Sequence, residues 1–272
     1  MKTDLTGKVA VITGANGVIC AEMTRALARS GAKVALLGRT YAKVEALASE
    51  IGENAFPVAC DCVKKEDLLR AREEILNKFG KVDILINGVG GNHPSATTFN
   101  ERAEDAEEGK KDFFGIDAEG FSFVFDTNLT SAFLATQVFA EPMLEKGGNI
   151  INISSMNAFR PLTKIPAYSA AKAALQNFTQ WLAVHFAGKG IRANAIAPGF
   201  FVTAQNKDLL FDAEGNPTPR SGKILTATPM HRFGKVEELT GALLFLADDS
   251  ASGFVTGTVL AVDGGFSAYS GV

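Results

Sequence analysis

Residues 9–17 read Val-Ala-Val-Ile-Thr-Gly-Ala-Asn-Gly, a short apolar run that ends in a glycine turn. A run of four to eight apolar residues bounded by a turn is typical of a buried strand. Residues 20–30 follow and predict a helix that ends at Gly31. Small residues between a strand and a helix let the backbone approach a pyrophosphate at the positive end of the helix. The stretch therefore predicts the first unit of a dinucleotide-binding fold.

The same alternation of apolar strands and helices continues along the chain. Further strands are predicted at 33–37, 56–60, 82–86, 149–153, 191–196 and 258–262, and helices near 41–51, 65–79, 123–145, 166–187 and 236–247. Continuous apolar strands separated by helices are typical of a parallel sheet that is covered on both faces. The sequence therefore predicts an α/β fold, with a single Rossmann-type doubly wound parallel sheet and helices on both faces.

Two polar stretches interrupt this alternation. Residues at about 91–122 carry many charged side chains and are predicted to form an insertion. Residues at about 204–231 contain Pro217, Pro219 and several glycines and are predicted to form a substrate lid. Because the alternation resumes after each stretch, we expect residues 1–272 to form a single dinucleotide-binding and catalytic domain.

Composition narrows the possible partners and surroundings. The chain of 272 residues has a formal net charge of -3 and no basic block, which argues against nucleic acid as a partner. No run approaches 18 apolar residues and the amino terminus lacks a signal-peptide pattern, so no membrane contact is expected. Cys20, Cys60 and Cys62 have no framework spacing, which favours a cytoplasmic location. We expect them to be small apolar packing residues, and we expect no metal site.

The glycine turn is the first candidate part of a cofactor site. Val18 and Cys20 stand where a conventional dinucleotide turn keeps glycine, so we expect the loop to pass the phosphates by a slightly different path. The residues expected to bind the cofactor here are Gly14, Asn16, Gly17, Val18 and Ile19.

The end of the second strand bears on the choice of cofactor. A carboxylate there would accept hydrogen bonds from the ribose 2′-hydroxyl of NAD, whereas an arginine would suit the 2′-phosphate of NADP. The sequence has Gly38-Arg39 and therefore favours NADP over NAD, although a solvated residue after a strand is the alternative for Arg39. Replacing Gly38 by Asp together with loss of Arg39 should then shift the preference toward NAD.

A tyrosine and a lysine form the candidate proton-transfer group. Tyr168 and Lys172 are four residues apart and share one face of the predicted helix. A lysine cation stabilises a nearby phenolate, which would lower the pKa of the tyrosine and make it a usable acid or base. Ser155 follows an apolar strand, at the edge where parallel sheets bind ligands, and its hydroxyl could hydrogen-bond a substrate carbonyl oxygen.

With these motifs, the sequence resembles the short-chain dehydrogenase/reductase family across nearly its whole length. Each motif is weak alone, but their order and spacing together are specific. The matching motifs are Thr13-Gly14, Asp61, Asn87-Gly88-Val89-Gly90, Asn128, Ser155, Tyr168-x-x-x-Lys172, Asn194-x-x-x-Pro198-Gly199, Thr203 and Asp263-Gly264-Gly265. The chain departs from the family in its glycine spacing at 17–20 and at Gly88, where asparagine is commoner.

The resemblance implies a role for each matching residue. Tyr168 would be the catalytic acid or base, Ser155 would position the carbonyl or alcohol, and Lys172 would contact the nicotinamide ribose. Asn128 would hold a water in a proton relay that reaches Lys172, unless it is only a helix-interior residue that ties strands together. The other cofactor contacts would come from Asp61, Cys62, Asn87, Gly88, Pro198, Gly199, Phe201 and Thr203.

Within the family, the glycine turn, residues 87–94 and the long insertion resemble the D-mannonate oxidoreductases, also called fructuronate reductases. The resemblance implies an NAD(P)-dependent oxidoreductase that interconverts D-fructuronate and D-mannonate, assembled as a homotetramer through the helix at 166–187 and the last strand. The alternatives are reduction of another carbonyl compound, of the gluconate or 3-oxoacyl type, and a nucleotide-binding protein without catalysis. The presence of Tyr168, Lys172 and Ser155 argues against the last.

Three segments are expected to meet at the substrate: 91–97, 156–164 and the lid. Amide and hydroxyl groups suit a polyhydroxylated sugar, and a basic side chain suits its carboxylate. His93 could instead be only a turn residue, and Arg160 and Lys164 could be solvated loop charges. The expected substrate-binding residues are His93, Ser155, Asn157, Arg160, Lys164 and Gln205.

Overall fold

One parallel sheet of seven strands forms the centre of the molecule. The computed structural model describes residues 3–203 and 206–271. The sheet has the order β3-β2-β1-β4-β5-β6-β7, and all neighbouring strands pair in parallel. The strands are β1 (Val9–Thr13), β2 (Lys33–Gly38), β3 (Ala55–Ala59), β4 (Ile84–Asn87), β5 (Gly148–Ile153), β6 (Ile191–Pro198) and β7 (Val259–Val262).

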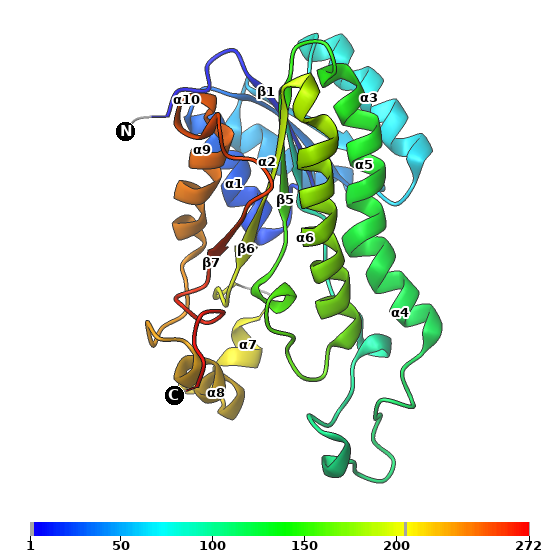
Figure 1. Cartoon of the computed structure of the whole chain (residues 1–272), viewed down its shortest axis with the longest axis vertical. Coiled ribbons are helices and arrows are strands. Elements are labelled where there is room, and N and C mark those ends of the chain that lie inside the picture. The colour runs from blue at the N-terminus through cyan, green and yellow to red at the C-terminus, as the bar shows by residue number, and fades with distance from the viewer. Residues whose placement is uncertain (1–2, 204–205, 272) are drawn as a thin grey trace.

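Helices cover both faces of this sheet, which confirms the predicted doubly wound fold (Figure 1). One face carries α1 (Val18–Arg29), α2 (Tyr41–Ile51) and α9 (Thr240–Ala247); the other carries α3 (Lys65–Phe79), α5 (Ser131–Ala140) and α6 (Pro166–Phe186). Successive strand residues point to opposite faces, so Ile12 packs in one core with Met23, while Val11 packs in the other with Phe139.

The strand order reverses direction between β1 and β4. In open α/β sheets a crevice forms at such a point, outside the carboxyl ends of the strands. The side chain of Thr13 bridges the two strands there, because its Oγ1 accepts a hydrogen bond from the Gly88 N–H at 3.0 Å and donates one to the Ile86 carbonyl at 3.4 Å. This edge is the place where a ligand site is expected.

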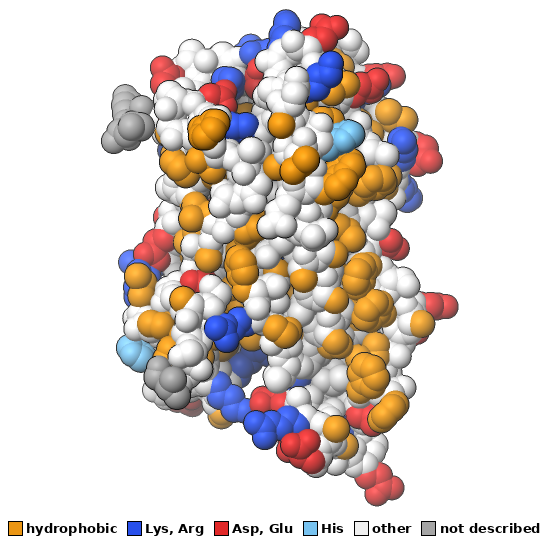
Figure 2. Space-filling view, viewed as in Figure 1, with side chains coloured by type: hydrophobic (Ala, Val, Ile, Leu, Met, Phe, Trp, Pro, Cys, Tyr) orange, Lys and Arg blue, Asp and Glu red, His pale blue; other side chains and the backbone are white. Residues whose placement is uncertain are grey.

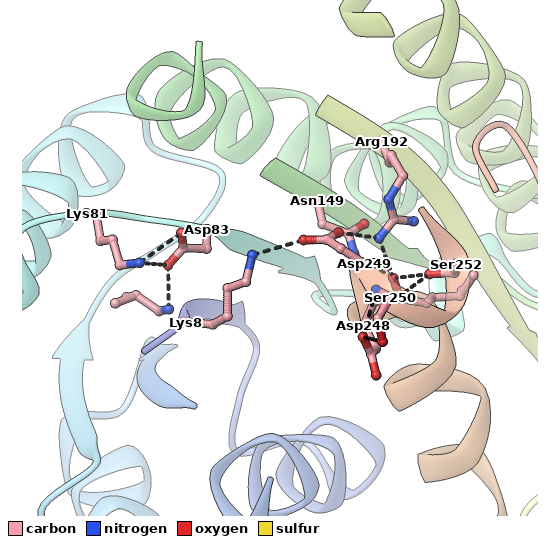
Figure 3. A network of polar contacts seen from close by, with 11 residues as sticks. Lys8, Lys81, Asp83, Asn149, Arg192, Asp248, Asp249, Ser250 and Ser252 are labelled. Carbon is pink, nitrogen blue, oxygen red and sulfur yellow. Dashed lines mark hydrogen bonds and ion pairs between the residues drawn. The ribbon is translucent and has the colours of Figure 1, made fainter. Parts of the chain in front are cut away.

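The opposite edge of the sheet is held by charged side chains (Figure 3). Asp249 of α10 (Asp249–Ser252) accepts hydrogen bonds from Lys8 and from the mostly buried Arg192, both at 2.9 Å. Asp83 accepts from Lys81 and from the backbone N–H of Val9 at 2.8 Å. These contacts join the amino ends of β1, β4 and β6.

The helix predicted at 123–145 is interrupted in the structure. It begins earlier, as α4 (Ala118–Phe125), because the Asp117 side chain accepts a hydrogen bond from the Glu119 N–H at 3.1 Å. A π-helical turn at Asp126–Thr130 then separates α4 from α5, and Pro142 lies in the short turn that follows α5. Of the other predicted elements, the helix at 236–247 begins as a 3₁₀ turn at Val236–Leu239 and continues as α9, and the rest match the observed bounds to within two residues.

The insertion and the lid both lie at the carboxyl edge of the sheet (Figure 1). Residues 91–117 precede α4, so the predicted insertion at 91–122 overlaps that helix. The described part of the lid contains α7 (Lys207–Leu210) and α8 (Pro219–Ala227). Lys223 of α8 donates to both carboxylate oxygens of Glu101 at 3.0 Å, which ties the lid to the insertion. Within the described ranges, no helix has the length and apolar character needed to cross a membrane.

Candidate active site

A pocket at the carboxyl edge of the sheet brings most of the predicted motifs together. It is bounded by the glycine turn, by the residues that follow β4, β5 and β6, and by the first turns of α6. The predicted site residues that line it are Gly17, Val18, Ile19, Gly88, Ser155, Tyr168, Lys172, Pro198, Gly199, Phe201 and Thr203.

The glycine turn has the geometry needed to hold a pyrophosphate. Gly14 has a φ of 65°, a left-handed conformation that favours glycine, and α1 begins four residues later at Val18. Gly17 is the residue before this helix, and because it has no side chain it cannot cap the N–H groups of the first turn. The first N–H groups of a helix have no partner within it, so these are open to an anion. The residues present therefore fit a dinucleotide.

Tyr168 and Ser155 both line this pocket. Tyr168 lies on the first turn of α6 and packs against a small cluster formed by Ala96, Val124 and Ala167. Burial raises the pKa of the Tyr168 phenol, and the hydrogen bond with Ser155 lowers it in part. The Ser155 hydroxyl also accepts from the Asn157 N–H at 3.2 Å. The phenol is therefore protonated near neutral pH, as a proton donor must be.

Lys172 lies one helical turn beyond Tyr168 and is buried. Its ammonium group donates to the Ile153 carbonyl at 2.8 Å and lies 5.7 Å from the centre of the Tyr168 ring. Burial lowers the pKa of Lys172 from its ordinary 10.5 to about 8. The sequence predicted that Lys172 would lower the pKa of Tyr168. In the structure burial has the largest effect on both groups, raising the pKa of Tyr168 and lowering that of Lys172.

Asn128 joins the segment after β4 to the π-helical turn. Its Nδ2 donates to the carbonyls of Gly91 and Val124 at 2.6 and 2.8 Å, and its Oδ1 accepts from the Gly91 N–H at 3.1 Å. A π-helical turn within a helix often marks a functional site, since it disturbs the regular backbone hydrogen bonds. The side chain of Asn128 is thus fixed on the residues that line the pocket.

The remaining predicted cofactor residues are not among those that line this pocket. Arg39 is exposed just after β2, and the Asn16 side chain lies beside Gly38. Asp61 follows β3, where its backbone N–H donates to Asp67 at 2.9 Å. Cys62 is buried, and a hydrogen bond with Cys60 together with burial raises the pKa of its thiol.

Asn87 makes its side-chain hydrogen bonds within the fold. Its Nδ2 donates to Thr136 of α5 at 3.0 Å and to Asn152 of β5 at 2.8 Å. Asn87 therefore ties β4 to the neighbouring strand β5 and to the helix α5.

Of the predicted substrate residues that the structure describes, Ser155 lines this pocket, whereas His93, Asn157, Arg160 and Lys164 are not among its lining residues. Arg160 donates from Nε to the Ser267 carbonyl at 2.9 Å, while the Lys164 ammonium lies 5.6 Å from the centre of the Phe99 ring. Asn157 is buried next to Ser155. His93 bonds Ser95 and packs on Phe123, with ring centres 5.1 Å apart. The predicted contact from Gln205 falls outside the described residues.

Several residues that line the pocket were not among the predicted site residues. Cys20 was interpreted only as a packing residue, and the glycines after Gly88 were not assigned a contact. The sequence contained one signal for them, because Gly90-Gly91 follows directly after a strand at the ligand-binding edge. The additional lining residues are Cys20, Gly90, Gly91, Ile153, Ser154 and Phe200, and Asn206 also lines the pocket, from the predicted lid.

The fold and this arrangement of serine, tyrosine and lysine define a nicotinamide-dependent oxidoreductase of the Rossmann type. The family described as Enoyl-(Acyl carrier protein) reductase matches residues 14–267. The chain belongs to the short-chain dehydrogenase/reductase family, whose members act on alcohol or keto groups with NAD or NADP.

Individual relatives extend this result. The chain is 58% identical to an uncharacterized oxidoreductase of Bacillus subtilis, UxuB, over 99% of this chain and 98% of that protein. It is 55% identical to a structure of a provisional D-mannonate oxidoreductase of Haemophilus influenzae with bound NAD, with a TM-score of 0.96 and coverage of 99% and 98%. A gluconate 5-dehydrogenase of Burkholderia cenocepacia, in complex with NADP and tartrate, is 31% identical, with a TM-score of 0.83 and coverage of 98% of each chain.

Proposed function

We propose that this oxidoreductase interconverts D-fructuronate and D-mannonate. The observation that carries the proposal is Arg160, on the loop that joins Ser155 to the helix of Tyr168. Only its Nε is engaged, by Ser267, and its two terminal nitrogens have no hydrogen-bond partner within the described residues. A guanidinium held in this way presents a planar pair of donors, which suits the carboxylate of a sugar acid. The similarity to the provisional D-mannonate oxidoreductase supports the same substrate.

In the proposed reaction the protein positions the substrate and moves a proton. The nicotinamide cofactor, when bound, gives or takes the hydride. Ser155 would donate a hydrogen bond to the carbonyl oxygen, which stabilises the negative charge that develops there. Tyr168 would donate its proton to the same oxygen during reduction and accept one during oxidation. The place of both side chains in one pocket, where Ser155 partly offsets the rise in the pKa of Tyr168, supports their action on one atom.

Lys172 and Asn128 would complete the proton path. A cationic Lys172 favours the phenolate that remains after Tyr168 has given up its proton. Asn128 would hold a water that leads from Lys172 to the outside, as the family resemblance implies. Because the pKa of Lys172 is lowered to about 8, its cation should be lost at moderately alkaline pH, and activity should fall with it.

The other parts of the proposal concern cofactor, architecture, assembly and location. NADP is favoured over NAD because Arg39 follows β2, where its guanidinium suits a 2′-phosphate, and because it has no hydrogen-bond or ion-pair partner in the described chain. The whole chain acts as one catalytic domain in the cytoplasm, with 91–122 as an insertion and 204–231 as a lid. A homotetramer is supported by exposed aromatic and aliphatic side chains on α5 and α6, among them Phe133, Trp181 and Val184. Figure 2 shows apolar side chains along this side of the molecule.

The test is a substrate panel with the purified protein and both cofactors. D-mannonate and D-fructuronate should give the highest kcat/KM, ahead of gluconate, its keto forms and a 3-oxoacyl thioester. A higher kcat/KM for gluconate would refute the proposed substrate and favour the activity of the 31% identical relative. Tyr168→Phe should lower kcat by about 10²-fold or more while cofactor binding persists, because only the transferable proton is lost. Near-normal turnover by that variant would refute the proposed acid–base role.

A further inference from the structure

The segment Gly88–Gly91, which follows β4, is held tightly between α1 and the catalytic residues. On the α1 side, the Cys20 thiol lies 3.7 Å from the Gly88 carbonyl oxygen, within the range of a weak sulfur hydrogen bond. A Cβ added to Gly88 would overlap the Cys20 sulfur and lie 2.8 Å from the Thr13 carbonyl oxygen. The thiol thus occupies the space that any side chain at position 88 would need.

The other side of the same segment touches Asn128 and Lys172. A Cβ added to Gly90 would lie 2.8 Å from Asn128 Oδ1 and 2.9 Å from Lys172 Nζ. The backbone N–H and carbonyl of Gly91 are both bonded to the Asn128 amide, at 3.1 and 2.6 Å. A shift of the segment by a few tenths of an ångström would therefore move both side chains, since the interior is too closely packed to absorb it.

The Cys20 thiol acts here as a packing and donor group rather than as a reactive one. It is 4% exposed, and burial raises its pKa to about 12. A thiol is inert as a nucleophile unless it is deprotonated, so its chemistry gives no reason for its place in this pocket. The reason is instead its position on α1, where the thiol contacts Gly88.

We propose that Cys20 is a positioning residue that, by supporting Gly88–Gly91, fixes the Asn128 amide and the Lys172 ammonium in the active site. The two departures from the family pattern at Cys20 and Gly88 are then one adaptation, because the thiol fills the volume left free by the glycine. The inference rests on the proposed role of Lys172 in proton transfer.

The pH dependence of turnover reports on this arrangement. The titratable groups that face Lys172 within the described chain are Tyr168 on its own helix and Cys20 on α1; Asn128 and the Ile153 carbonyl are uncharged. A Cys20 thiolate would raise the pKa of Lys172, but the thiol has a pKa of about 12 and is uncharged at the pH where Lys172 titrates. Removing the thiol would leave a space that admits water, which would ease the burial that keeps the pKa of Lys172 at about 8. The alkaline limb of the kcat profile should therefore move to higher pH.

Cys20→Ala and Cys20→Ser test the proposal, with Met23→Ala as the matched control. Met23 is fully buried on the same helix and in the same core, but it does not line the pocket. We expect Cys20→Ala to lower kcat about 3- to 10-fold and to raise the alkaline pKa of kcat by roughly 0.5 or more. Cys20→Ser keeps a donor of similar size and should restore both values. Met23→Ala should lower Tm and leave the alkaline limb in place.

The paired substitution gives a second readout. Gly88→Ala should be strongly damaging in the wild-type chain and about 10-fold less damaging beside Cys20→Gly, because one of its two close contacts is then removed. An unchanged alkaline limb in Cys20→Ala, or an equal shift in Met23→Ala, would overturn the proposal; so would equal damage by Gly88→Ala in both backgrounds. All assays use whichever substrate the wild-type enzyme turns over best, so a wrong substrate assignment leaves these outcomes readable. An error in the proposed acid–base role would be detected separately, because the Tyr168→Phe variant would then remain active.

Discussion

Removing the Arg39 side chain should change the preference between the two cofactors. The side chain follows β2, is exposed, and forms no hydrogen bond or ion pair with the described residues, so its loss leaves no broken contact behind. A charge-assisted contact between arginine and a phosphate contributes about 1.5–3 kcal/mol. Solvent reduces this at an exposed site, so we expect Arg39→Ala to lower kcat/KM for NADP about 10-fold and for NAD less than about 3-fold.

The assay is the initial rate with each cofactor at fixed substrate, and Arg29→Ala is the matched control. Arg29 is an exposed arginine at the far end of α1, bonded to Glu22. A wild-type enzyme with a higher kcat/KM for NAD than for NADP would refute the reasoning, as would equal losses with both cofactors in Arg39→Ala. The 55% identical neighbour has bound NAD, whereas we propose NADP for this chain, so the two kcat/KM values decide between the cofactors.

The reverse change, Gly38→Asp, is harder than the sequence alone indicated. A Cβ at position 38 would lie 2.6 Å from Asn16 Oδ1 and 2.7 Å from Val44 Cγ1. Asn16 can rotate away, but Val44 is fully buried in α2 and has a stiff branched side chain. The expected gain of NAD preference therefore requires a smaller residue at position 44 as well, and Gly38→Asp alone should lower Tm.

Three further predictions concern the substrate, stability and assembly. Arg160→Ala should raise KM for the sugar acid about 10- to 100-fold and leave KM for an uncharged alditol nearly unchanged; equal effects on both would contradict carboxylate binding by Arg160. Burial of Asp249 raises its pKa, but hydrogen bonds from Lys8 and Arg192 outweigh this and lower the pKa below 3.8. Asp249→Asn should therefore lower Tm by about 1–3 °C at neutral pH. The difference in Tm between the two proteins should vanish as the pH falls below 3.8 and the native carboxyl is protonated. Trp181→Glu should reduce the mass measured by light scattering, because a subunit contact through α6 would then bury a charge. Phe254→Glu, at a fully exposed position, should leave the mass unchanged. An unchanged mass in Trp181→Glu would argue against the face of α5 and α6 as the subunit contact.

The sheet and the centre of the site were predictable because their signals are local. The apolar runs at 9–13 and 149–153 have the length and composition of buried strands, and the structure confirms both to within a residue. Parallel strands present their carboxyl ends at one edge, so the serine after β5 and the tyrosine four residues before Lys172 could be assigned to one place before any coordinates were known.

The parts that could not be predicted depend on contacts between distant residues. Cys20 meets the Gly88 carbonyl across 68 positions, Arg160 meets Ser267 across 107, and Lys223 meets Glu101 across 122. Periodicity and spacing carry no information about such pairs. The π-helical turn at Asn128 was missed for a related reason, because the residues at 123–140 read as one apolar helix and only the contact with Gly91 distinguishes the turn.

The residues proposed for proton transfer and those proposed for substrate selection lie on different kinds of structural element. Ser155, Tyr168 and Lys172 stand after a central strand and on a helix of 21 residues, where hydrogen bonds hold Ser155 and Lys172 and a small apolar cluster packs against Tyr168. The candidate substrate contacts lie instead on loops that are tied to one another. The Thr98 N–H donates to the Lys164 carbonyl at 2.9 Å, and the Lys223–Glu101 pair links the lid to the insertion. Exposed ion pairs of this kind contribute little to stability, so the loops can change without cost to the fold. Substitutions in the loops should therefore alter KM and substrate choice, whereas substitutions at Tyr168 or Lys172 should abolish turnover for every substrate alike.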